Sequence, residues 1–399
     1  MNFRRPVAFP QFPRKEGWNM KLLFVMDHYN PNNGVTVSAL RYARELAARG
    51  HTVRFLGTGV PNPEDWNLAQ FHLPVFDRLI TAQGMVFAKS DKEIITQAVT
   101  WADCVHFLVP FALSARTATI AKRLRKPMTA AFHVQPQNIS YSIGMGRLAP
   151  VNALIYWYFR VTFYRRFRHI HCPSAFIAGQ LKKHRYKAQL HVISNGVGPQ
   201  FTFQERQPKP PEWAGKFVIL MIGRLSGEKR QDVLIDGINR SKYRQNIQLV
   251  LAGQGPRESA IRRRGQCLPN PPHIAFYTQP DLRRLLGQAD LYVHAADAEI
   301  EAMSCMEAFS SGLVPIIADS PQSATPQFAL EEHSLFRAGD AQDLARKIDW
   351  WIEHPQRRAE MGKAYSISGE KYALPACVDA FWEMLAQEMS THHPKEAEG

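Results

Sequence analysis

Apolar runs alternate with segments of helical periodicity along the first half of the chain. Lys21 to Met26 (KLLFVM) predicts a buried strand, and after a loop at 27–34 the apolar repeat predicts a helix that runs through Arg49. A second strand is expected from His51, and another over 128–132. Strand, helix and strand in this order are typical of a parallel sheet with helices on its faces.

The same order starts again in the second half of the chain. A strand is expected at Phe217 to Ile222 (FVILMI), with a helix at about 230–238 behind it. Further strands are expected at 248–252, 274–277, 291–294 and 314–318. The Pro- and Gln-rich stretch 198–211 between the halves has the composition of a linker.

These patterns predict an α/β chain with two Rossmann-like domains, residues 20–200 and 201–373. An N-terminal extension, residues 1–19, precedes them. A helix at 374–390 follows the second domain, and its apolar positions suit packing on either domain. The polar tail at 391–399 is expected to be disordered.

Composition narrows the class of protein. With 399 residues, 45% of them hydrophobic and 21% charged, the chain has the make-up of a folded protein rather than a small disulfide scaffold. No apolar run approaches the roughly 18 residues that span a bilayer, and the first nineteen residues lack the apolar core of a secretory signal. The five cysteines are scattered without a CxxC pair, which favours a reducing compartment. We therefore expect a cytoplasmic protein.

Charge is distributed unevenly over the two halves. The net charge is +14, and residues 1–200 contain 26 Lys and Arg against 9 Asp and Glu, whereas residues 201–399 contain 23 against 26. Between Asp103 and Glu205, 101 consecutive residues include no carboxylate but fourteen Lys or Arg. The basic first half therefore favours an anionic partner.

Within this acid-free stretch, residues 156–171 (YWYFRVTFYRRFRHIH) predict a basic, aromatic, amphipathic helix. Its apolar positions at helical spacing are Tyr156, Phe159, Phe163, Phe167 and Ile170. Such a helix suits an anionic membrane, where each basic residue contributes about 1 kcal/mol. Nucleic acid is a second candidate partner, and a buried interdomain helix whose arginines reach solvent is the structural alternative.

The first motif with chemical meaning is IGRLSGEK, residues 222–229. A strand ends in Gly223, Arg224 follows, and Lys229 stands at the opening of the next helix. Glycine lets the backbone pass close to a ligand, and two cations near a helix N-terminus can hold a diphosphate. The alternative is a pair of ordinary basic residues near a helix start.

The second motif is Glu299 to Glu307 (EIEAMSCME), which follows a predicted strand. If a helix begins after Glu299, that carboxylate lies in the loop at the carboxyl end of the strand, where ligands bind in open α/β sheets. One carboxylate would accept hydrogen bonds from sugar hydroxyls and the other from a ribose. The alternative is a helix with solvated glutamates.

Together the two motifs resemble the family-4 retaining glycosyltransferases, enzymes of GT-B architecture whose two Rossmann-like domains face each other across a cleft. The resemblance covers residues 20 to about 390. It rests on the glycine and two cations of the first motif, on the two spaced glutamates, and on Ala308, Gly312 and Pro315 after the second of them.

The resemblance implies roles for these residues. Arg224 and Lys229 would hold the donor's diphosphate and stabilise the leaving nucleotide, Glu307 would bind the ribose, and Glu299 would lie at the donor sugar. The same resemblance implies that the Gly34 amide contacts the phosphates and that His133, at the end of strand 128–132, lies beside the donor sugar. The candidate catalytic residues are Glu299, His133, Arg224 and Lys229, and the donor-binding set is Gly34, Gly223, Arg224, Lys229, Glu299 and Glu307.

One departure from the family pattern lies between the two glutamates. Glu301 and Ala302 occupy positions where the family often has an aromatic residue and a glycine. Glu301 is therefore a second candidate for the carboxylate at the donor sugar.

The resemblance also implies transfer with retention of the anomeric configuration. Arg224, Lys229 and helix N-termini would supply the positive field for the leaving diphosphate, so we expect no metal ion and no cofactor, and a UDP-hexose as the donor.

The basic first half favours a membrane-borne lipid or lipid-linked glycan as acceptor, with the protein on the inner face of the membrane. The candidate acceptor-side residues are Arg160, Phe163, Arg165, Arg166 and Arg168. The alternatives are a soluble sugar or polysaccharide acceptor, or a non-catalytic membrane- or nucleic-acid-binding protein on the same fold. No specific nucleic acid is expected.

Overall fold

The computed structural model describes residues 19–30, 33–71, 86–142, 145–146 and 148–392. The predicted N-terminal extension up to residue 18 and the predicted disordered tail from residue 393 lie outside these ranges. Thr391 and His392, which were expected in the tail, belong to the last helix.

The N-terminal domain is built on a seven-stranded parallel sheet of order β3-β2-β1-β6-β7-β8-β9. Its strands are β1 (Lys21–His28), β2 (Thr52–Thr58), β3 (Trp66–Asn67), β6 (Cys104–Phe107), β7 (Met128–Ala131), β8 (His169–Cys172) and β9 (Gln189–Val192). Its helices are α1 (Gly34–Ala48), α3 (Lys92–Trp101), α4 (Ala112–Arg123), α5 (Pro136–Ser142), α6 (Ala149–Thr162) and α7 (Ala175–Lys183). A short antiparallel pair, β4 (Gln70–Phe71) and β5 (Phe87–Ala88), accompanies the sheet.

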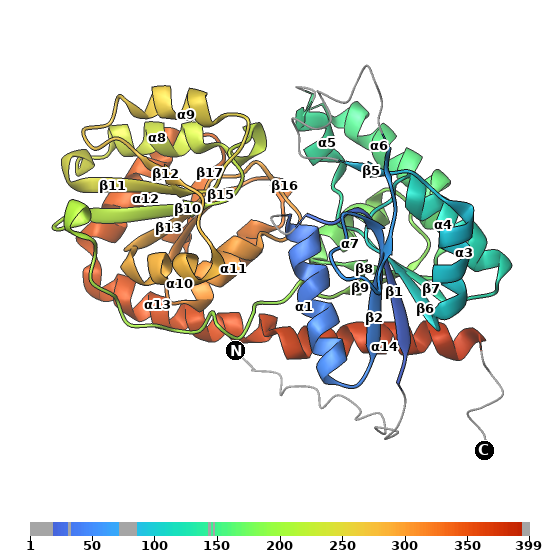
Figure 1. Ribbon diagram of the computed structural model, residues 1–399. Coiled ribbons are helices and arrows are strands. Elements are labelled where there is room, and N and C mark those ends of the chain that lie inside the picture. The colour runs from blue at the N-terminus through green and yellow to red at the C-terminus, as the bar shows by residue number, and fades with distance from the viewer. Residues whose placement is uncertain (1–18, 31–32, 72–85, 143–144, 147, 393–399) are drawn as a thin grey trace, which may run out of the picture.

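The C-terminal domain repeats this architecture with a six-stranded parallel sheet of order β12-β11-β10-β13-β15-β17. Its strands are β10 (Phe217–Ile222), β11 (Ile247–Ala252), β12 (His273–Ala275), β13 (Leu291–His294), β15 (Pro315–Asp319) and β17 (Leu335–Arg337). Its helices are α8 (Gln231–Arg240), α9 (Glu258–Gly265), α10 (Gln279–Gln288), α11 (Met303–Ser310), α12 (Ala341–Glu353) and α13 (Pro355–Gly369). The two sheets lie side by side, each covered by helices (Figure 1), so the predicted α/β fold with two Rossmann-like domains is confirmed.

The last helix, α14 (Leu374–His392), returns to the N-terminal domain. Figure 1 shows it in red, running beneath the N-terminal sheet. Phe381 packs its ring at 6.1 Å from Phe24 of β1 and at 5.2 Å from Tyr42 of α1. The sequence left the partner of this helix open, and the structure shows that its apolar positions complete the N-terminal core.

The predicted basic helix at 156–171 is wrong in its second half. Helix α6 ends at Thr162, a 3-10 turn covers Tyr164–Arg166, and residues 169–172 form the buried strand β8. Phe163 and Phe167 pack their rings at 5.8 and 5.4 Å from Phe107. The helix ends there because these rings fill the core and the chain then pairs with β7 and β9.

This correction separates the predicted acceptor-side residues. Phe163 is buried and makes no part of the surface, whereas Arg165, Arg166 and Arg168 are exposed and Arg160 is half-buried. The apolar positions predicted to face a membrane are therefore mostly buried in the core of the N-terminal domain.

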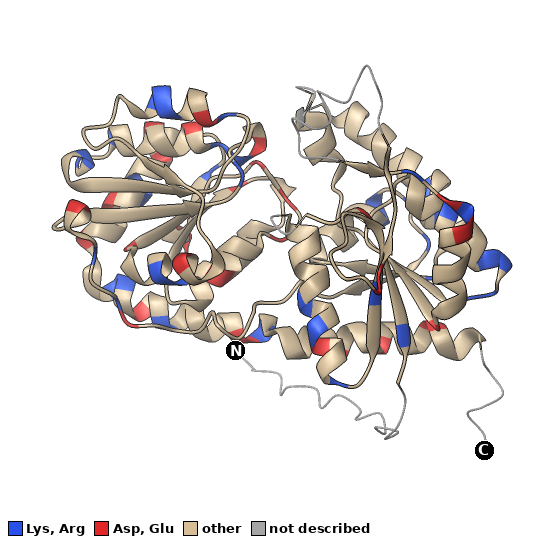
Figure 2. Ribbon diagram, in the orientation of Figure 1, with Lys and Arg blue, Asp and Glu red and all other residues tan. Residues whose placement is uncertain are grey.

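A different set of apolar side chains is exposed on and just before α6. Its members are Met145, Leu148, Leu154, Trp157 and Tyr158, each between 38% and 62% exposed. The last three follow helical spacing and share one face. Helices α5 and α6 carry no Asp or Glu, while both signs of charge occur over the C-terminal helices (Figure 2). We call these five residues the α6 patch.

Among the described residues, no helix combines the length and the apolar character that a bilayer-spanning segment needs.

Candidate functional site

The loop after β10 carries the first predicted motif. Gly223 follows the strand with a φ of 152°, a conformation that residues with a side chain rarely adopt. A Cβ built on Gly223 would lie 3.8 Å from Cε of Lys229, which ends a 3-10 turn at Gly227–Lys229. Arg224 is exposed beside this glycine. The loop thus brings the predicted diphosphate-binding residues to one turn at the carboxyl end of β10.

Lys229 forms a largely buried ion pair with Glu299 of the short strand β14 (Ala298–Glu299). The ammonium donates a hydrogen bond to Oε1 of the carboxylate. His294, fully buried at the end of β13, places Nε2 at 3.3 Å from the same oxygen. The structure therefore joins the two sequence motifs, 70 residues apart, into one charged cluster.

Electrostatics keep both members of this pair ionised. Burial opposes the charged carboxylate, but Lys229 and His294 lower the pKa of Glu299 to about 2. Burial likewise opposes the charged ammonium, but Glu299 and Glu228 outweigh it and raise the pKa of Lys229. A diphosphate bound at the Gly223 loop would give this lysine a second anionic partner.

The second predicted glutamate has a different partner. Glu307 lies in α11, and its Oε1 accepts a hydrogen bond of 2.5 Å from Nη2 of Arg41 in α1. Both side chains are nearly buried, at 7% and 11% exposure. Burial raises the pKa of Glu307, and the guanidinium offsets part of that rise. The carboxylate predicted to bind ribose is thus held by a residue of the other domain.

Glu301 lies at the interdomain boundary. Its Oε2 accepts a hydrogen bond of 2.8 Å from the backbone N–H of Asn195, in the segment after β9. Burial raises the pKa of Glu301 to about 7, although hydrogen bonds from Ser194 and Asn195 oppose that rise. Of the two carboxylates that the sequence left open, Glu299 is the one paired with Lys229.

The departure at Ala302 is visible in the backbone. Ala302 has a φ of 64°, in the left-handed region, and forms the N-cap of α11. A side chain there costs roughly 1 kcal/mol, a cost that glycine avoids. A glycine at position 302 would adopt this left-handed conformation without that cost.

Helix α1 faces α11 across the boundary. Gly34 is its first residue, and a Cβ built there would lie 3.3 Å from Cε of Met303, the first residue of α11. One turn later, Ser38 places Oγ at 3.1 Å from the sulfur of Met303. The predicted phosphate-contacting amide of Gly34 therefore lies next to the helix that carries Glu307.

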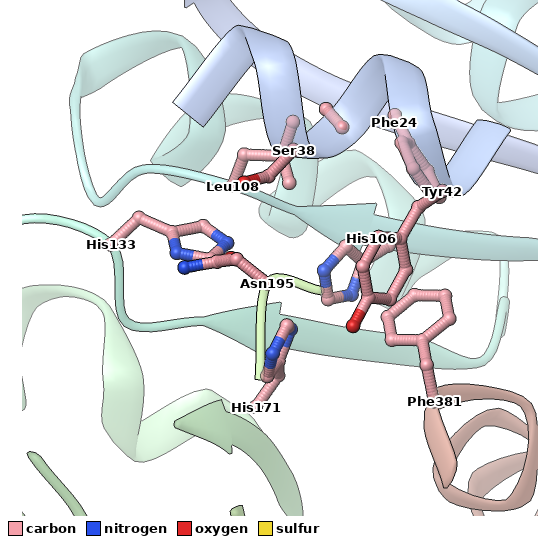
Figure 3. A pocket seen from close by; sticks show the side chains of 10 residues that line it. Phe24, Ser38, Tyr42, His106, Leu108, His133, His171, Asn195 and Phe381 are labelled. Carbon is pink, nitrogen blue, oxygen red and sulfur yellow. The ribbon is translucent and has the colours of Figure 1, made fainter. Parts of the chain in front are cut away.

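His133 lines a small pocket of the N-terminal domain, just beyond β7. Figure 3 shows its ring with His106, His171 and the amide of Asn195 around the pocket. The rings of His133 and His171 are 5.3 Å apart, nearly perpendicular. Asn195 and Ser38 also line this pocket, and they bond to Glu301 and Met303 of the other domain. His133 is therefore on the N-terminal side of the boundary, whereas Lys229 and Glu299 are on the C-terminal side.

The three histidines of this pocket are neutral. Burial is the main cause that lowers the pKa of His171 to about 4 and those of His106 and His133 well below the ordinary value. His106 shares a 2.8 Å hydrogen bond with Thr129, and His171 one of 2.7 Å with the carbonyl of Ile193. A neutral imidazole can donate or accept a proton at an acceptor hydroxyl.

Sequence reasoning missed several residues at the boundary. Tyr141 of α5 donates to Asp297, which also pairs with Arg230 at 3.0 Å. His294 could have been found, since it ends a predicted strand five residues before Glu299. Arg41 had no such signal, because 266 residues separate it from Glu307.

Two models of known protein families match the chain, one over each domain. Residues 202–366 match the model of the glycosyl transferases group 1, and residues 32–201 match that of glycosyltransferase family 4. The two matches meet between the domains and together cover most of the chain.

Two curated relatives and one solved structure are among the most similar proteins. The alpha-monoglucosyldiacylglycerol synthase of Streptococcus pneumoniae is 26% identical over 324 residues, 75% of this chain and 71% of the relative. The GDP-mannose-dependent alpha-mannosyltransferase of Corynebacterium glutamicum is 24% identical over 391 residues, 94% of this chain and 88% of the relative. The Anabaena protein HepE, solved with UDP and glucose, shares the fold with a TM-score of 0.70 at 16% identity, over 92% of this chain and 100% of that one.

Proposed function

The chain belongs to the group 1, family 4 glycosyltransferases, and from that premise we propose that it transfers a hexose from a UDP-sugar to a membrane-borne lipid or lipid-linked glycan. The observation that carries the proposal is the buried cluster of Lys229, Glu299 and His294 beside the Gly223 loop. This cluster presents a cation for the leaving diphosphate and a carboxylate for sugar hydroxyls on the same edge of one sheet.

Retention of the anomeric configuration is part of this proposal. Two relatives carry the word alpha in their names, and formation of an α-linked product from an α-linked nucleotide hexose requires retention. Lys229 and Arg224 would stabilise the departing diphosphate by electrostatics, without a metal ion. The UDP and glucose bound to the Anabaena protein support a UDP-sugar, and the GDP-mannose relative makes GDP-sugars the first alternative to test.

A lipid acceptor is supported by the position of the α6 patch. Helix α6 packs on α5 through a 2.6 Å hydrogen bond from Ser140 to Asn152. Helix α5 in turn reaches the C-terminal domain through Tyr141 and Asp297. A membrane that receives the α6 patch would therefore lie one helix away from the donor cluster. Exposed aromatic and leucine side chains on a helix without acidic residues are typical of surfaces that bind anionic bilayers.

The test is nucleotide release by the purified protein from a panel of UDP-, GDP- and ADP-sugars, with and without vesicles that contain anionic lipid. We expect release from one donor, stimulated by the vesicles and lost in Glu307→Ala. Release that vesicles do not change would assign a soluble acceptor. No turnover and no nucleotide binding under any condition would favour a non-catalytic binding protein.

Vesicle sedimentation tests the α6 patch separately. The double substitution Leu154→Ser with Trp157→Ser should release the protein from anionic vesicles. Ile367→Ser is the matched control, because Ile367 is 66% exposed on α13 of the other domain. Equal binding by both variants would exclude the α6 patch as the membrane contact.

A further inference from the structure

The ribose site of the proposed donor is held from both domains. We infer that Arg41, on the first helix of the N-terminal domain, is a positioning residue that holds the Glu307 carboxylate in place for the donor's ribose. This inference rests on the proposed function, since it takes Glu307 as the group that binds ribose.

The contact is part of a matched pair of helix faces. Gly34, Ser38 and Arg41 recur every three or four residues along α1 and so share one face. Met303 and Glu307 are four residues apart on α11 and share another. Gly34 and Ser38 meet Met303, and Arg41 meets Glu307. Figure 1 shows the two helices approaching each other between the domains.

Arg41 is itself fixed by its surroundings. Its Nη1 donates a 3.3 Å hydrogen bond to the carbonyl of Gly196, while Nη2 donates to Oε1 of Glu307. Its guanidinium also lies 6.0 Å from the centre of the Phe201 ring. Gly196 and Phe201 belong to the segment that joins the domains. Contacts with this segment therefore orient the Arg41 guanidinium toward Glu307.

The geometry leaves the carboxylate able to accept further bonds. A carboxylate offers two oxygens and about four lone pairs, and Arg41 uses Oε1 through one N–H. A ribose hydroxyl can therefore bind Glu307 while the guanidinium stays in place.

The charge of Glu307 depends on this contact. Burial raises its pKa, and Arg41 is the cation that lowers it. Among the described residues, Tyr292 of β13 also interacts with Glu307. Burial raises the pKa of Tyr292, and the nearby Glu307 carboxylate raises it further. Without the guanidinium, the buried carboxyl takes up a proton more readily and accepts hydroxyl hydrogen bonds less strongly.

The test measures binding of UDP and of 2′,3′-dideoxy-UDP to the full-length protein by calorimetry between about pH 6.5 and pH 8.5. The wild type should prefer UDP by about 10-fold or more, with little dependence on pH. Arg41→Gln should weaken UDP binding about 10-fold at the lower pH and recover affinity as the pH rises. Binding of dideoxy-UDP should barely change, and Arg41→Lys should lie in between.

Arg44→Gln is the matched control, because Arg44 is exposed on the same helix. An Arg41→Gln protein that binds UDP as the wild type does, or more tightly, overturns the inference. Equal loss of UDP and dideoxy-UDP also overturns it, because that result marks a structural role. A wild type that binds UDP without preferring it over dideoxy-UDP removes the ribose role of Glu307, and a wild type that binds neither refutes the UDP donor as well.

Discussion

The two domains present different chemistry to their common boundary, although both place the carboxyl ends of parallel strands there. On the C-terminal side, Lys229 and Glu299 are largely buried as charged partners. On the N-terminal side, His106, His133 and His171 are buried as neutral rings. Burial disfavours charge on both sides, and Lys229 and Glu299 stay charged because each has the other as a partner of opposite charge. This difference fits the proposed function, in which the anionic donor binds the C-terminal domain and a neutral acceptor hydroxyl meets the N-terminal domain.

Removing Lys229, the cation of the C-terminal cluster, should have the largest effect on activity. Lys229→Ala leaves Glu299 buried beside His294 without its main partner and takes a cation from the diphosphate. We expect kcat/KM for the donor to fall by about 100-fold or more, measured by nucleotide release.

Lys363→Ala on α13 is the control, because Lys363 is exposed on the same domain. Activity within about threefold of the wild type in the Lys229 variant would show that the charged cluster does not serve the diphosphate.

Lowering the pH should destabilise the folded protein through the buried histidines of the N-terminal domain. The folded-state pKa of His171, about 4, lies below the ordinary value of 6.5, so the unfolded chain takes up the proton first. The stability that the neutral His171 contributes is therefore fully present above about pH 6.5, and it is lost as the pH falls toward 4. Between about pH 7 and pH 5 the wild type should lose about 2 kcal/mol more stability than His171→Asn.

The measurement is urea denaturation of both proteins across this pH range. The difference between them is decisive, because Asp27 and Glu301, with pKa values of about 7, act in the opposite direction in both. Parallel pH profiles would mean that His171 is protonated in the folded protein.

Glu301 lies at the boundary between the two domains, and its titration should have the smallest effect, a change in stability with pH. Its folded-state pKa of about 7 exceeds the ordinary 4.5, so stability from the protonated form is lost as the pH rises through 7. Glu301→Gln keeps an acceptor for the Asn195 N–H but cannot ionise. Its free energy of unfolding, relative to that of the wild type, should increase by about 1 kcal/mol between about pH 6.5 and pH 8.5, as measured by urea denaturation. A constant difference across that range would argue against a protonated Glu301.

Much of the fold could be predicted because it depends on local pattern. The strands at Phe217–Ile222 and Leu291–His294 agree with the structure to the residue. Apolar runs of this length, separated by helical repeats, admit few arrangements other than parallel sheets. The helix predicted over 156–171 was wrong in its second half, because aromatic residues at helical spacing also suit a helix end followed by a buried strand.

The sequence by itself determined the two-domain fold, the Gly223 loop and the pair of glutamates with seven residues between them, since all of these follow from neighbouring residues. Which cation each glutamate meets was decided only by the tertiary structure. Glu299 finds Lys229 in its own domain, and Glu307 finds Arg41 in the other. The first contact depends on how strands and loops of one domain pack, and the second depends on how the two domains lie against each other. No local periodicity in the sequence specifies either geometry.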